Sequence, residues 1–225
     1  MIFNDRMIFI HIGKTGGMSC TNYLLNNLAG PIHSVHQEAV EEAARLGLSH
    51  IKCHSDLSRH CTLERGLNFI RLLTGRVLAD YDRVVVVFRH PVTLEYSFYE
   101  HLKKPHVRER RKKNRALLNL ANGDFLTFIK KSGYHRPGLA QQDFVTINGS
   151  IPDCVTIVKF EQLTTEFPDT VSRFLKSSSP APFPHNNRSS YQKPLRDQIT
   201  PEVLAAVYEK HRFLFDNRIY ELEDF

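Results

Sequence analysis

The sequence predicts an α/β fold, in which parallel strands alternate with helices. The run RVVVVF at 83–88 is β-branched and apolar at successive positions, as expected of a strand buried on both faces of a parallel sheet. Other short apolar runs alternate with segments of helical spacing, the pattern of right-handed βαβ crossovers. The chain has 225 residues, of which 41% are hydrophobic, so we expect one domain over 1–225 with a sizeable core.

The first half of the chain alternates strand and helix signals. The apolar run MIFIH at 7–11 ends in a Gly-rich turn and predicts a buried strand. Positions 18–28 and 63–73 repeat large apolar residues at helical spacing, and the Glu- and Ala-rich stretch 37–46 also favours a helix. A second strand is predicted over 49–53, immediately before a polar loop.

In the second half, prolines and capping residues mark where helices begin. Pro91 opens a helix directly after the 83–88 strand, and Asp124 is an N-cap candidate for a helix through Lys131. A further strand is predicted over 155–160 and a helix over 167–176. Thr200 and Pro201, an N-cap residue followed by proline at the first helical position, begin the last helix.

The net charge of +6 comes from one segment. Residues 103–115 (KKPHVRERRKKNR) hold eight Lys or Arg and one Glu, which leaves 22 basic and 23 acidic residues elsewhere. A nucleic-acid surface would spread its charge more widely, so no nucleic-acid partner is expected. The segment is a basic loop or helix extension, and two interpretations stay open: a solvated face, or a patch for an anionic partner.

Composition also restricts the location of the protein. The longest aliphatic run is Val84–Val87, which is too short to span a bilayer, and no signal peptide is evident. The four cysteines form no CxxC pair, which favours a reduced, cytoplasmic protein. A membrane anchor upstream of this sequence remains an open alternative.

The strongest local signal is the segment 11–19, HIGKTGGMS, between the first strand and the first helix. Two glycines let the backbone approach a ligand closely, and the free N–H groups at the helix start favour an anion. Lys14 adds a positive charge and Ser19 a hydroxyl. Lys14 precedes both Gly16 and Gly17, so the segment is not a Walker A loop, and a magnesium-dependent NTPase is disfavoured. The alternative is an ordinary turn with a solvent lysine.

This segment resembles the first loop of the sulfotransferases, especially the branch with Golgi carbohydrate and heparan sulfate sulfotransferases, which reads roughly H-x-P-K-T-[AG]-G-T-S. Gly13 replaces the usual proline and Met18 the usual threonine. The resemblance implies a P-loop-kinase-like parallel sheet flanked by helices on both faces. It also implies that the 5′-phosphosulfate of 3′-phosphoadenosine-5′-phosphosulfate (PAPS) is bound by Lys14, Thr15, Gly16, Gly17, Met18 and Ser19.

A second family signature, R-[DH]-P-x-x-R-x-x-S-x-[YFW], follows the 83–88 strand. Here Arg89 and Ser97 stand eight positions apart, as in the family, and Leu94 replaces the second Arg. The resemblance implies that Arg89 and Ser97 hold the 3′-phosphate of PAPS, and the planar fork of an arginine suits a phosphate dianion. The alternative for Ser97 is a helix hydroxyl that bonds its own turn.

Sulfuryl transfer also needs a base for the acceptor proton and a cation for the leaving phosphate. In the glycan branch, a catalytic His or Glu commonly follows the second core strand, and His54 is the best match, with His50 as the alternative. Lys14 serves the leaving group. A zinc site from Cys53, His54, His60 and Cys61 is disfavoured because the usual ligand spacings are missing, so we expect no metal.

The late segment 177–194 holds four prolines and predicts a long loop, from which the resemblance implies that Arg188 touches PAPS. The resemblance thus implies a sulfotransferase that moves the sulfuryl group of PAPS to a hydroxyl acceptor, most readily a glycan, neutral or anionic. Two alternatives remain. One is an ATP-dependent P-loop-like kinase, which would need magnesium. The other is a non-catalytic protein that binds anionic glycans through 103–115.

Overall fold

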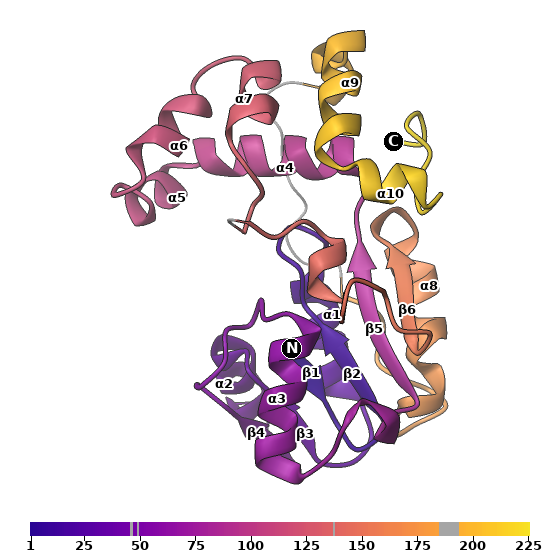
Figure 1. Ribbon diagram of the computed structural model, residues 1–225. Coiled ribbons are helices and arrows are strands. Elements are labelled where there is room, and N and C mark those ends of the chain that lie inside the picture. Colours follow the sequence, from indigo (N-terminus) through magenta and orange to yellow (C-terminus); the bar gives the residue numbers. More distant parts are fainter. Residues whose placement is uncertain (46, 49, 137, 185–193) are drawn as a thin grey trace. The chain divides into compact units, whose positions relative to one another are not determined.

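The computed structural model describes residues 1–45, 47–48, 50–136, 138–184 and 194–225 (Figure 1). Contacts along the chain group it into two compact units. We call the first, Met1–Phe88 with Gln141–Asn186, the sheet unit, and the second, Arg89–Ala140 with Asn187–Phe225, the helical unit.

The sheet unit contains a six-stranded sheet in the order β4-β3-β1-β2-β5-β6. Strand β1 is antiparallel to both of its neighbours, and all other pairs are parallel. The α/β class is therefore confirmed, whereas the expectation of a wholly parallel sheet is wrong for β1, whose two residues are too few for a sequence pattern. The strands are β1 (Ile2–Phe3), β2 (Met7–Ile10), β3 (Ile32–Ser34), β4 (Ile51–Cys53), β5 (Arg83–Phe88) and β6 (Val155–Lys159).

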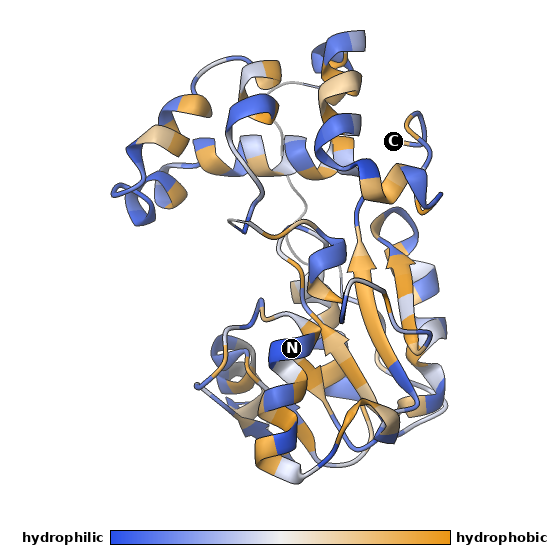
Figure 2. Ribbon diagram, viewed as in Figure 1, coloured by the Kyte–Doolittle hydropathy of each residue, from blue (hydrophilic) through white to orange (hydrophobic). Residues whose placement is uncertain are grey.

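Helices cover both faces of this sheet. On one face Phe9 and Val87 pack in a cluster with Tyr23 and Phe167, which come from α1 and α8. On the other face Gly66 of α3 lies against the side chain of Met1, where a Cβ would be 2.6 Å from the sulfur. Figure 2 shows the resulting apolar strands in orange. The helices are α1 (Gly17–Asn27), α2 (Gln37–Arg45), α3 (Leu63–Thr74) and α8 (Leu163–Val171).

Most predicted boundaries agree with the structure to within two residues, but α8 differs. Sequence analysis placed this helix over 167–176, whereas it spans Leu163–Val171 and is followed by a 3-10 turn at Ser172–Phe174. Pro168 lies inside α8, whereas proline is favoured in the first turn of a helix, so the sequence carries no clear signal for the start at Leu163. The predicted loop 177–194 carries neither helix nor strand at its described residues, 177–184 and 194.

In its described part the helical unit contains six α-helices (Figure 1). Aromatic side chains pack between them. Tyr96 of α4 meets Phe125 of α7 edge-on, with ring centroids 5.3 Å apart, and Phe98 meets Phe128 at 5.4 Å. The predicted N-caps are confirmed for α7 and α9, because Asp124 accepts from Thr127 N–H at 2.8 Å and Thr200 from Val203 N–H at 3.3 Å. The helices are α4 (Pro91–Lys103), α5 (Pro105–Arg110), α6 (Arg115–Leu120), α7 (Phe125–Lys131), α9 (Pro201–Lys210) and α10 (Arg212–Asp216).

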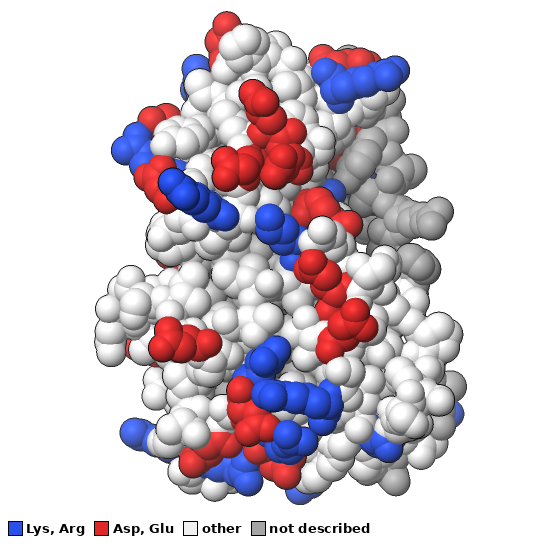
Figure 3. Space-filling model, turned by 90° about the vertical axis from the view of Figure 1, so that its right-hand side faces the viewer, with Lys and Arg blue, Asp and Glu red and all other residues white. Residues whose placement is uncertain are grey.

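The basic segment 103–115 is largely helical. It runs from the end of α4 through α5 to the start of α6. Arg108 donates to the amide oxygen of Asn122 at 2.9 Å, and Lys112 pairs with Glu109 at 2.6 Å. Arg111 is half-buried, and its pKa is lowered by this burial and by the neighbouring charges of Arg110 and Arg136. Lys and Arg side chains are thus concentrated in this segment. On the face of the molecule that Figure 3 shows, by contrast, positively and negatively charged side chains are intermixed.

Two further observations concern the whole described chain. Within the described ranges, no helix combines the length and the apolar character that crossing a bilayer requires. All four cysteines fall in these ranges, and none is in a disulfide.

Candidate functional site

The loop after β2 turns sharply into α1. Lys14 and Gly16 both have left-handed backbone conformations, with φ of 71° and 75°. This conformation is uncommon for a residue with a side chain, so the turn places a lysine at an unfavourable position. The hydroxyl of Thr15 donates to the carbonyl of Ile12 at 3.0 Å and closes the turn. Gly16 then serves as the N-cap of α1.

Gly16 and Gly17 of this loop are both required by close packing. A Cβ on Gly16 would lie 2.5 Å from a methyl carbon of Leu163, and one on Gly17 would lie 2.0 Å from the His11 ring. The N-cap residue of α1 is a glycine and has no side chain that could cap the helix, so the N–H groups of Gly17 and Met18, which precede the first intrahelical bond of Ser19, have no intrahelical acceptor. The loop therefore presents backbone donors, together with the positive end of the helix dipole, and suits an anion.

A group of histidines lies beside this loop and was not assigned a role by sequence analysis. The rings of His11 and His60 meet edge-on with centroids 4.7 Å apart, and His11 stacks with His36 at 5.9 Å. Arg59 donates to Nε2 of His36 at 3.1 Å. Burial, followed by the charge of His60, lowers the pKa of His11 well below its usual value. His11 is therefore neutral at pH 7, and its buried Nδ1 has no hydrogen-bond partner in the described ranges.

His54, the predicted base, lies at the end of β4. Its Nε2 is 2.9 Å from Nδ1 of His33, and the two rings are nearly parallel. Burial lowers the pKa of His54; the charge of Lys52 lowers it further and that of Asp56 raises it. His50 is exposed in the turn before β4, so its expected place inside the strand is wrong. The strand begins later because it pairs only with the three residues of β3.

In the helical unit, Arg89 directly follows β5 and is buried, with 8% of its surface exposed. Its Nε donates to the hydroxyl of Thr93 at 3.0 Å, and that hydroxyl donates to the carbonyl of His90. Ser97 lies on α4 and is 2% exposed. In the described part of the chain its hydroxyl has no hydrogen-bond partner, so it does not bond its own helical turn. Leu94 is buried as well.

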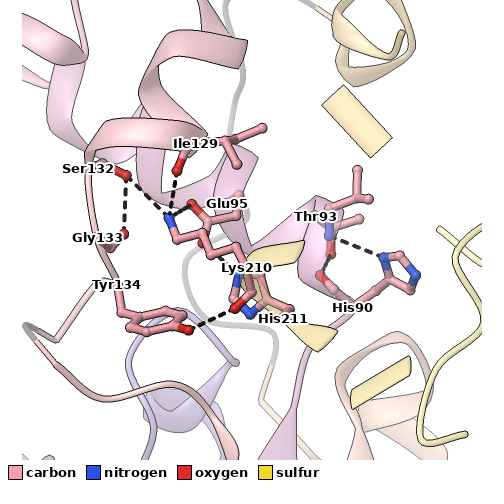
Figure 4. A network of polar contacts seen from close by, with 10 residues as sticks. His90, Thr93, Glu95, Ile129, Ser132, Gly133, Tyr134, Lys210 and His211 are labelled. Carbon is pink, nitrogen blue, oxygen red and sulfur yellow. Dashed lines mark hydrogen bonds and ion pairs between the residues drawn. The ribbon is translucent and has the colours of Figure 1, made fainter. Parts of the chain in front are cut away.

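Buried polar contacts hold α4 in place within the helical unit. Glu95 accepts from Lys210 at 2.9 Å and bonds Nε2 of His211 at 2.7 Å, and Figure 4 shows both side chains directed at its carboxylate. Burial raises the pKa of Glu95, but the His211 bond and the charge of Lys210 outweigh it and hold the pKa below its usual value. His90 donates from Nε2 to the carbonyl of Glu221 at 2.8 Å. Sequence analysis missed these contacts because the partners are more than a hundred positions apart.

The candidate residues thus fall into three places. Lys14 to Ser19 form the end of the loop after β2 and the first turn of α1 in the sheet unit. His54 lies at the end of β4, and Arg89 and Ser97 belong to the helical unit. Arg188 lies outside the described residues. Within the described ranges no group of three or more His, Cys, Asp or Glu side chains is arranged to hold a metal ion.

Comparisons with known proteins add nothing to this description. No model of a protein family matches the chain, and no curated protein matches it in sequence.

Proposed function

We propose that this protein transfers a sulfuryl group from PAPS to a hydroxyl group of a carbohydrate. One observation carries the proposal. Two sites suited to anions follow neighbouring parallel strands. The segment from Lys14 to Ser19, which we call the glycine loop, follows β2. Arg89 follows β5, and Ser97 lies on the helix after it. In open α/β sheets, ligands bind outside the carboxyl ends of the strands. The spacing of Arg89 and Ser97 and the order of the two sites are those that the resemblance to sulfotransferases implies.

The glycine loop fits the phosphosulfate end of the donor. A Cβ on Gly16 or Gly17 would clash with Leu163 or His11, so internal packing requires both glycines and fixes the conformation of the loop. The outward N–H groups at the start of α1 would donate to the oxygens of the 5′-phosphosulfate. Lys14 supplies the positive charge, and the backbone of Met18 offers a donor although its side chain has no hydroxyl.

Arg89 and Ser97 fit the 3′-phosphate. Arg89 is buried at the beginning of α4, and a guanidinium can offer two parallel hydrogen bonds to a phosphate. A buried hydroxyl without a partner is rare in proteins, and it is explained when a ligand supplies the acceptor. The hydroxyl of Ser97 is such a group within the described residues.

The reaction is an in-line displacement at sulfur. The acceptor oxygen forms a bond to sulfur while the bond from sulfur to the bridging oxygen of the 5′-phosphate breaks, and 3′-phosphoadenosine-5′-phosphate (PAP) leaves. Lys14 stabilises the charge that grows on the departing phosphate. The acceptor proton passes to His54, the histidine that the resemblance implies as the base.

Calorimetry with PAP and with ATP, each with and without magnesium, tests the proposal. We expect PAP to bind more tightly than ATP and to need no magnesium, because only PAP carries the 3′-phosphate. Magnesium-dependent binding of ATP with no binding of PAP would instead support a kinase. If a Lys14→Ala variant no longer binds PAP but still binds anionic glycans, glycan binding is a separate property of the segment 103–115.

A further inference from the structure

Three large apolar side chains lie exposed together at the end of α3. Leu72 is 86% exposed, Leu73 43% and Val77 47%, and we call these residues the α3 patch. Within the described residues one other large hydrophobic residue is exposed to a similar extent, Phe225 of the helical unit. Single exposed apolar residues are common on protein surfaces, whereas a group of them is typical of an interaction site.

The α3 patch is presented by an ordered turn. Gly75 ends α3 in the left-handed conformation, with φ of 77°, and its N–H donates to the carbonyl of Arg71 at 2.9 Å. Beyond this turn, the N–H of Val77 donates to the carboxylate of Asp80 at 2.8 Å. The exposed side chains are therefore held by their own backbone and do not belong to a loose loop.

The charge around the α3 patch is positive. Residues 65–77 contain three arginines, Arg65, Arg71 and Arg76, and neither Asp nor Glu. Arg65 and Arg71 are exposed, and neither forms an ion pair in the described part of the chain. The acids that flank this segment are Glu64, at the opposite end of α3, and Asp80, whose carboxylate already accepts a backbone N–H. The patch therefore combines apolar side chains with uncompensated positive charge.

The α3 patch and the glycine loop lie at opposite edges of the sheet. Strand β5 begins at Arg83, shortly after the patch. The glycine loop instead follows the carboxyl end of β2, which runs parallel to β5. Figure 1 shows the end of α3 towards the edge where these two strands begin. A partner bound to the patch therefore leaves the glycine loop uncovered.

We propose that the α3 patch binds an anionic phospholipid membrane. Leu72 and Leu73 enter the headgroup layer, and the arginines beside them contact lipid phosphates. Each Lys or Arg close to an anionic membrane adds to the attraction. The proposal is independent of the proposed function, because it uses none of the residues assigned to PAPS.

A second copy of the chain is a less suitable partner for the α3 patch. Stable protein interfaces involve about 20–30 residues a side, and the few apolar side chains of the patch do not provide such an area. In a two-fold symmetric contact the same surface meets itself, so the arginines of one copy would face those of the other. A lipid headgroup layer, in contrast, needs no matching cavity and offers negative charge.

Co-sedimentation with lipid vesicles tests the proposal. The vesicles consist of phosphatidylcholine alone, or of phosphatidylcholine mixed with phosphatidylserine, which supplies the negative charge. The leucine variant, Leu72→Ser with Leu73→Ser, removes the apolar contact. The arginine variant, Arg65→Gln with Arg71→Gln, removes the charge. All four positions are exposed, so thermal unfolding should be unchanged in both variants.

Two controls separate the α3 patch from other causes of binding. Replacing Arg110 and Lys113 by Gln also removes positive charge, but in the basic segment. Sedimentation velocity without lipid measures the oligomeric state. Because the chain has no tryptophan, Leu72→Trp places a single fluorescent reporter in the patch, and Phe225→Trp places one outside it.

We expect the unmodified protein to bind the vesicles that contain phosphatidylserine. The affinity should fall about tenfold or more in the leucine variant, and roughly fivefold for each arginine replaced in the arginine variant. The variant with Arg110 and Lys113 replaced should keep its affinity. With these vesicles, the emission of Leu72→Trp should shift to shorter wavelength and that of Phe225→Trp should not.

Three results would overturn the proposal: no binding to vesicles with phosphatidylserine, equal binding by the leucine variant, or a loss of binding only when Arg110 and Lys113 are replaced. A dimer that dissociates in the leucine variant, without vesicle binding by the unmodified protein, would assign the α3 patch to a second copy instead.

Discussion

Glu95 and His211 form a hydrogen bond of 2.7 Å although each is almost completely excluded from solvent, with 2% and 1% of its surface exposed. Lys210 completes the group by pairing with the other carboxylate oxygen at 2.9 Å. Glu95 belongs to α4, and its two partners lie at the end of α9 and just after it. The contact therefore holds the helix that carries Ser97 and that begins directly after Arg89 and His90.

Glu95→Ala should destabilise the protein strongly. The substitution leaves the ammonium of Lys210 buried without its carboxylate, and breaking a buried pair in this way costs about 3–5 kcal/mol. Urea unfolding measures the change. Glu209→Ala is the matched control because Glu209 pairs with Arg212 on the surface, at 2.6 Å, where such pairs are worth about 0–1 kcal/mol. Equal losses for the two variants would show that the Glu95 group does not stabilise the helical unit.

The carboxylate of Glu95 should also make the stability of the protein depend on pH. The pKa of Glu95 in the folded protein is lowered from 4.5, so folding favours its charged form. Its contribution is then fully present above the ordinary glutamate pKa and is lost as the pH falls through the lower, folded pKa. We expect the free energy of unfolding to decrease below pH 4.5 more steeply in the unmodified protein than in Glu95→Gln. Parallel curves for the two proteins would contradict this assignment.

Arg89→Ala should weaken PAPS much more than adenosine-5′-phosphosulfate, since only PAPS carries the 3′-phosphate. A hydrogen bond to a charged group is worth about 1.5–3 kcal/mol, which corresponds to roughly tenfold to over a hundredfold in affinity. Competition calorimetry measures both donors. Ser97→Ala should show the same selectivity with a smaller loss. If both donors weaken equally in Arg89→Ala, Arg89 does not bind the 3′-phosphate.

Neutralising the basic segment should affect an anionic acceptor and not the donor. With Arg110, Arg111 and Lys113 replaced by Gln, we expect a higher KM for a polyanionic glycan and unchanged PAP affinity. The difference should shrink in high salt, because salt screens the attraction between exposed charges. Replacing Arg45, Arg71 and Arg76 instead, which lie on the sheet unit, controls for net charge. If the KM is unchanged with every polyanion tested, the basic segment does not bind the acceptor and is only a solvent-exposed face.

Gly17→Ala should disturb the glycine loop. The new methyl group would lie 2.0 Å from the His11 ring, so the ring or the start of α1 must move. Overpacking of this kind costs about 1–3 kcal/mol, and we also expect PAP affinity to fall. Thermal unfolding and calorimetry measure the two effects. Gly123→Ala is the control, because a Cβ there comes no closer than 3.5 Å to the Leu120 carbonyl. A Gly17→Ala variant as stable as the control would refute the packing argument.

Several features were predictable from the sequence because their signals are local. The run of β-branched residues is enough to predict the strand at 83–88. A proline or a capping side chain at the first position is enough to predict where α4, α7 and α9 begin. The loop at 11–19 is identified in the same way, since its glycines, lysine and following helix are adjacent in the chain. Residues that act together within a few positions leave a pattern that can be read without a structure.

Other features depend on which distant residues meet, and only the tertiary structure decided them. Strand β1 has two residues and is defined by its antiparallel partners β2 and β3. In the sequence, Glu95 looks like an ordinary helical residue. Only the tertiary structure shows that it is buried and paired with Lys210 and His211. The sequence by itself directed attention to the segment after β4 for a base, and to His54 as its first histidine. That His60 lies against His11, just before the glycine loop, follows from a contact between residues 49 positions apart, which no local sequence pattern shows.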